Sequence, residues 1–83
     1  MPQTWIFERA SERIVVSRHS FVNCTHLIVV AHDGTTRSRS FDTTDDAILY
    51  QALFERALTA AGWVLDEVVA PIDEHMAVDL GHV

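Results

Sequence analysis

The sequence predicts an α+β domain, in which a four-stranded antiparallel sheet carries one helix packed on one of its faces. Segments rich in β-branched and aromatic residues succeed one another between residues 4 and 41, with short polar connections between them. A single segment with helical spacing of its apolar residues follows, between residues 42 and 61. Because hairpins place consecutive strands side by side, we expect a β-meander with the strand order 1-2-3-4.

Four strands are expected in chain order, over residues 4–8, 13–19, 25–32 and 35–41. Asp33-Gly34 lies between the last two strands, and this dipeptide favours a two-residue type I′ turn, whose central residues both need positive φ angles. Such a turn would place Val30 opposite Arg37. It would also place Ile28 opposite Arg39, so that both arginines would share a sheet face with these apolar residues.

The helix is expected after Phe41, with Asp42, Thr43 and Thr44 as candidate N-caps. Its apolar stripe is expected to comprise Tyr50, Leu53, Phe54, Ala57, Leu58 and Ala61. The opposite, solvent-facing side is expected to comprise Gln51, Glu55 and Thr59. Gly62 suits the left-handed position after the helix, and Trp63 can fold back as its hydrophobic partner. A short fifth strand over residues 64–69 would run antiparallel to the first strand if it joins that edge.

The chain is expected to form one domain over residues 1–70, followed by an acidic, flexible tail over residues 71–83. A chain of 83 residues builds only a modest core. Its single cysteine excludes an internal disulfide and fits a reducing compartment. We expect a cytoplasmic protein with no signal peptide and no membrane-spanning segment.

The two faces of the expected sheet differ in what can cover them. The helix is expected on the face that collects Trp5, Phe7, Ile14, Val16, Leu27, Val29 and Ala31. The other face has an apolar centre that the helix cannot reach, formed by Ile6, Val15, Ile28 and Val30. An odd number of residues in the loop at 20–23 would reverse the third and fourth strands and bring Leu27 and Val29 to this outer face, without the two arginines.

An uncovered apolar sheet centre favours association, so we expect an interaction module that forms a homodimer. The candidate interface residues are Ile6, Val15, Ile28 and Val30. The alternative is a binding protein for an anionic ligand or single-stranded nucleic acid, because guanidinium groups match phosphate and carboxylate geometry. The candidate anion-binding residues are Arg13, Arg37 and Arg39.

Charge weighs against a nucleic-acid partner. The chain has a net charge of -6 and contains no lysine. Residues 1–41 hold five arginines against three acidic residues, a net of +2, whereas residues 42–83 hold one arginine against nine acids, a net of -8. Because phosphate backbones bind cationic surfaces, we do not expect nucleic acid as a partner.

No catalytic constellation, cofactor motif or metal site is predicted. Cys24 and His26 share a strand face, but no oxyanion hole or third catalytic residue accompanies them in the sequence. His26 and His32 would lie roughly 20 Å apart along a strand, too far for one metal ion. We therefore expect a non-enzymatic protein without a cofactor.

Overall fold

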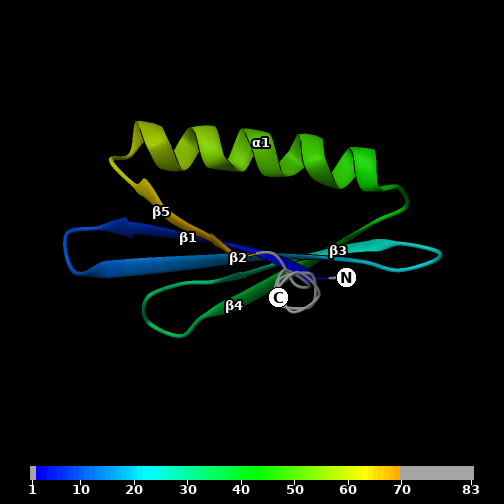
Figure 1. Ribbon diagram of the computed structural model, residues 1–83, viewed down its shortest axis with the longest axis horizontal. Coiled ribbons are helices and arrows are strands. Elements are labelled where there is room, and N and C mark those ends of the chain that lie inside the picture. Colours follow the sequence, from blue (N-terminus) through cyan, green and yellow to red (C-terminus); the bar gives the residue numbers. More distant parts are fainter. Residues whose placement is uncertain (1, 70–83) are drawn as a thin grey trace, which may run out of the picture.

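The computed structural model describes residues 2–69, which form a five-stranded antiparallel sheet with one helix over it (Figure 1). The elements are β1 (Pro2–Arg9), β2 (Glu12–Ser20), β3 (Thr25–Val30), β4 (Thr36–Phe41), α1 (Thr44–Ala60) and β5 (Val64–Val69). The strand order across the sheet is β4-β3-β2-β1-β5. This confirms the predicted α+β meander and its fifth strand, which joins β1 antiparallel. The predicted acidic tail over residues 71–83 lies outside the described residues.

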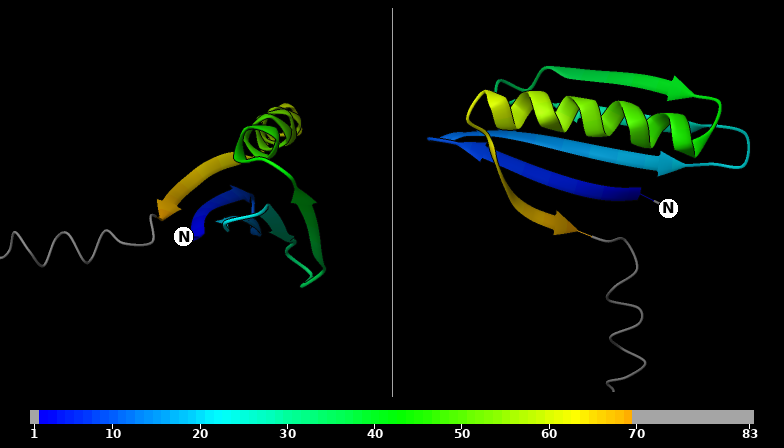
Figure 2. Two further views of the ribbon diagram at one scale, coloured as in Figure 1. Left: turned by 90° about the vertical axis from the view of Figure 1, so that its right-hand side faces the viewer. Right: turned by 90° about the horizontal axis from the view of Figure 1, so that it is seen from above.

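The helix runs along one face of the sheet, and no described element lies over the other face (Figures 1 and 2). Buried apolar side chains from three strands, from α1 and from the segment after it meet between these two layers. They are Phe7, Val16, Leu27, Leu58 and Trp63. Trp5, Ile14, Val29, Phe41 and Phe54 pack around them. The core therefore lies wholly on the helix side.

The β2–β3 hairpin has the predicted parity. Its loop contains four residues, 21–24, and the Phe21 N–H donates to the Cys24 carbonyl at 2.8 Å. Val16 consequently pairs with Val29, and both side chains face the helix. The even loop length confirms the main prediction for this hairpin, and the alternative with a reversed third strand is wrong.

The β3–β4 hairpin differs from the prediction by one residue. Val29 pairs with Arg37, and Leu27 pairs with Arg39. The predicted pairings of the two arginines with Val30 and Ile28 are therefore wrong. Because side chains alternate between the faces of a strand, this shift moves every side chain of β4 to the opposite face, and both arginines lie on the helix side.

The loop explains the shift. The Ala31 N–H donates to the Thr35 carbonyl at 2.8 Å, which leaves a loop of three residues, 32–34, rather than two. Gly34 has a φ of 90°, and the Asp33 carboxylate accepts a hydrogen bond from the Thr35 N–H at 2.9 Å. A turn followed by a left-handed glycine is the usual three-residue hairpin loop, so the Asp-Gly dipeptide suits both loop lengths. The observed register also turns Phe41 toward the core.

Local signals in the sequence fix both ends of α1. The Thr43 side chain accepts a hydrogen bond from the Asp46 N–H at 3.1 Å and so caps the first turn. At the other end, Gly62 has a φ of 95°, and the Trp63 N–H donates to the Leu58 carbonyl at 3.0 Å. This is the Schellman geometry, and it confirms the predicted roles of Gly62 and Trp63.

The face that the helix buries is rotated from the predicted one. Gln51, expected to face solvent, is only 4% exposed, whereas Leu53, expected in the apolar stripe, is 56% exposed. Arg18 on β2 lies beneath the helix and explains the difference, because its Nη1 donates to the Gln51 Oε1 at 2.9 Å. The Gln51 amide in turn donates to Glu55 at 2.7 Å. Gln51 can thus be buried because its side-chain oxygen accepts a hydrogen bond from Arg18.

Candidate functional site

The four candidate interface residues lie together on the sheet face away from the helix, which we call the open face. Val15 stands between Ile6 and Val30 in neighbouring strands, so the three side chains form a row across β1, β2 and β3. Ile28 lies beside this row on β3. All four side chains are partly buried by their neighbours alone. The open face therefore has a continuous apolar centre, as predicted, while its role as an interface stays a prediction.

One end of the open face carries charge. Arg13 donates to the Glu8 carboxylate from Nη2 at 2.7 Å and from Nε at 3.2 Å. These hydrogen bonds, and then the negative charge of Glu8, raise the pKa of Arg13 above its ordinary value, and Asp66 and Glu67 on β5 add to the effect. Arg13 is thus already engaged by an acid, and acids outnumber it in its surroundings.

The other end of the open face carries aromatic side chains. His19 pairs with His26 across β2 and β3, and the Phe21 ring stacks on His19 with a centroid distance of 6.5 Å. The same ring meets His26 edge-on at 5.4 Å, and His26 Nε2 lies 3.3 Å from the Ser40 hydroxyl. Phe21 itself is 60% exposed. The sequence placed both histidines on this face but did not indicate that Phe21 joins them, although an aromatic residue in a short polar loop was a signal for it.

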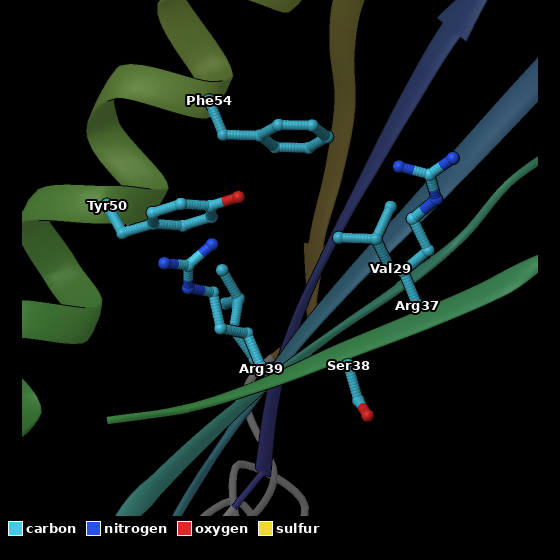
Figure 3. Close-up of a pocket in the computed structure, with 7 residues that line it drawn as sticks. Val29, Arg37, Ser38, Arg39, Tyr50 and Phe54 are labelled. Carbon is cyan, nitrogen blue, oxygen red and sulfur yellow. The ribbon is translucent and has the colours of Figure 1, made fainter. Parts of the chain in front are cut away.

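The other two candidate anion-binding residues lie on the opposite side of the sheet. Arg37 and Arg39 border a hollow of about 240 Å³ between α1 and the strands β3 and β4 (Figure 3). Ser38, between them, points away from the hollow. We call this hollow, lined by Leu27, Val29, Arg37, Arg39, Tyr50 and Phe54, the arginine groove.

The two groove arginines differ in what they contact. The Arg39 guanidinium lies 4.8 Å from the Tyr50 ring centroid and 5.8 Å from that of Phe41, which holds its charge against aromatic faces. Arg37 has no hydrogen-bond, ion-pair or ring partner among the described residues. The structure therefore does not bring the three predicted arginines together: one is paired with an acid on the open face, and two border the groove.

The remaining chemistry-bearing residues do not assemble a reactive centre within residues 2–69. Cys24 is a free, partly buried thiol. No group of three or more His, Cys, Asp or Glu residues in this range has metal-binding geometry. Within the same range, no helix is long and apolar enough to cross a bilayer.

The chain matches no known family model, and neither the curated proteins nor the solved structures contain a significant match to it.

Proposed function

We propose that this protein is a small cytoplasmic interaction module that forms a homodimer through its open face. The observation that carries the proposal is the row of Ile6, Val15 and Val30, with Ile28 beside it, on a sheet face that no described element covers. Burial of such a face contributes roughly 25 cal/mol per Å² of apolar surface, from which the cost of association is subtracted.

The size of the core supports association. Only six apolar residues among those described are buried, each no more than 8% exposed. Small domains with so few buried side chains gain much of their stability from further burial, by disulfides, metals or association. The chain has one cysteine, so an internal disulfide is excluded. Residues 2–69 hold no group of three or more His, Cys, Asp or Glu that could bind a metal ion. Of the three ways named, association is therefore the one that this part of the chain supports.

Polar groups on the open face suit a second copy as the partner. One end carries Glu8 in its ion pair with Arg13, and Glu67 of β5 flanks the apolar centre. The other end carries His19 and His26, whose ring N–H groups can donate hydrogen bonds to carboxylates. A two-fold axis across the strands would superimpose the apolar centres and bring the histidine end of one copy to the acidic end of the other, which is the self-complementarity that a two-fold interface requires.

An anionic ligand or a nucleic acid on this same face finds less support. Arg37 and Arg39 face the helix, and Arg13 is held by Glu8 at 2.7 Å. The open face thus offers no free arginine among the described residues, and its acidic end would repel phosphates.

Sedimentation equilibrium over a concentration series tests the dimer. We expect the wild type to approach the mass of two chains and Val15→Glu to remain at the mass of one, because a carboxylate would be buried in the interface. The near-ultraviolet circular dichroism of Trp5 and Trp63, which both pack on the other side of the sheet, reports whether the variant stays folded. Ile28→Glu provides a second variant should Val15→Glu unfold.

Leu53→Glu is the matched control. Leu53 is 56% exposed on the outer surface of α1, so the substitution adds the same charge to a different apolar surface. We expect it to leave the dimer intact. A wild type that remains monomeric at all concentrations, or a dimer lost in Leu53→Glu and retained in Val15→Glu, would refute the proposed interface.

A further inference from the structure

We propose that the arginine groove binds a small amphiphilic carboxylate, with its apolar body against the apolar lining of the groove and its carboxylate on the Arg37 guanidinium at the rim. This site lies on the opposite side of the sheet from the open face and does not depend on dimer formation.

The groove is apolar in its depth. Leu27 and Val29 of β3 line it from the sheet, and Tyr50 and Phe54 line it from α1. Figure 3 shows Val29 facing the rings of Tyr50 and Phe54. A second hollow of about 360 Å³ adjoins it and shares Val29, Arg37 and Phe54 with it. We call these two adjoining hollows together the trough, and the second hollow by itself is in the size range in which proteins hold small organic ligands.

The trough is open because the helix packs unevenly. It buries Ala47, Gln51 and Leu58 against the sheet and leaves Tyr50, on its β4 side, 37% exposed. The β4 residues that face the trough are arginines, whose long side chains rise at its rim rather than fill it. Apolar surface thus stays accessible between α1 and β4, which is the part of this site that an apolar ligand body would cover.

The two arginines at the rim carry the positive charge of the site. Arg37 has no partner among the described residues, and Arg39 lies on the Tyr50 ring, 4.8 Å from its centroid. The Arg37 guanidinium beside an apolar surface offers forked hydrogen-bond donors to a carboxylate. Arg39 turns away from Arg37 toward the helix and adds positive charge to the rim (Figure 3).

One acidic residue lines the second hollow, and among the described residues it forms no ion pair with either arginine. Asp33 accepts a hydrogen bond from the Thr35 N–H at 2.9 Å, and the hydrogen bonds from Thr35 lower the pKa of Asp33 below its ordinary value. Its carboxylate is thus already engaged by the hairpin loop. A bare inorganic anion would leave the apolar trough empty, and a cation would meet two arginines, so an anion with an apolar body fits both parts of the site.

The test is a titration of the ¹⁵N-labelled protein with decanoate, followed by two-dimensional NMR. We expect chemical-shift changes centred on Val29, Arg37 and Phe54. Octyltrimethylammonium, which has an apolar chain and the opposite charge, should cause no such changes, and acetate should bind far more weakly. Arg37→Gln should weaken decanoate binding by about tenfold or more, because a charged hydrogen bond is lost.

Arg13→Gln is the matched control, because it removes the same charge from the open face. It should leave the affinity for decanoate unchanged. Shifts centred on Val15 or Ile28, equal binding of the cationic probe, an undiminished affinity in Arg37→Gln, or no shifts at millimolar decanoate would each overturn the proposal. Because the readout is the location of the shifts, these results are independent of whether the open face forms a dimer.

Discussion

The open face and the arginine groove lie on opposite sides of one sheet, and both combine apolar side chains with arginine. They differ in what the guanidinium groups contact. On the open face, Arg13 is held by Glu8 at 2.7 Å in an ion pair. In the groove, Arg39 lies on an aromatic ring and Arg37 has no partner among the described residues. The open face therefore favours association through its apolar centre, whereas the groove retains charge that an anionic ligand can use.

The two sides also differ in how they are packed. On the helix side, Val16 and Leu27 are almost completely buried, whereas their chain neighbours Val15 and Ile28, on the open face, are partly exposed. Adjacent residues in one strand thus experience different environments. This contrast allows the contribution of each side to stability to be measured separately.

The largest expected effect comes from comparing Leu27→Ala with Ile28→Ala. Leu27 is 2% exposed, so its truncation leaves a cavity and should lower the free energy of unfolding by about 3 kcal/mol at any protein concentration. Ile28→Ala should cost about 1 kcal/mol in the monomer, because less apolar surface is lost from burial. Urea unfolding at several protein concentrations measures both.

The dependence of these two free-energy costs on protein concentration tests whether the open face is buried in a dimer. If the open face is buried in a dimer, the cost of Ile28→Ala rises with protein concentration, while that of Leu27→Ala is set within one chain. A cost of Ile28→Ala that is the same at all concentrations would contradict burial of the open face.

An intermediate effect is expected at the hydrogen bonds beneath the helix. Gln51→Leu removes the acceptor of the Arg18 guanidinium at 2.9 Å and should lower the free energy of unfolding by about 2 kcal/mol, because a partly buried charged donor is left unsatisfied. Thermal unfolding by circular dichroism measures it. The double variant Arg18→Met with Gln51→Leu should recover part of the loss, since an apolar pair leaves no unpaired charge. No recovery would show that the glutamine acts by its shape rather than by this bond.

The smallest expected effect tests the loop that decides which face carries the arginines. Gly34→Ala should cost about 1 kcal/mol, because Gly34 has a φ of 90° that an alanine adopts only with strain. No atom lies within 4 Å of the added Cβ, so steric overlap does not contribute. Gly34→Asn is the control and should cost less, because asparagine tolerates the left-handed region. Hydrogen exchange of the β4 amides localises the change. Equal stability of both variants and the wild type would argue against the positive φ of Gly34.

The order of the strands and the bounds of the helix could be predicted from the sequence because their signals are local. The periodicity of short apolar segments gives the meander. The Thr43 cap and the Gly62-Trp63 ending depend only on residues within one turn of the helix. The apolar centre of the open face was also predictable, because the even-length loops of the first hairpins preserve the parity of the faces.

The tertiary structure alone decided where the groove arginines lie. Asp33-Gly34 is compatible with a loop of two or three residues, and the choice between them reverses every side chain of β4. In the observed register Phe41 packs against the core. The core residues are distant from Phe41 in the chain, so the local sequence around Phe41 does not reveal this contact. Gln51 is buried for the same kind of reason, since its partner Arg18 is 33 residues away in the chain. Local sequence thus determined the elements and their order, while packing between distant residues determined which side of the sheet received the charge.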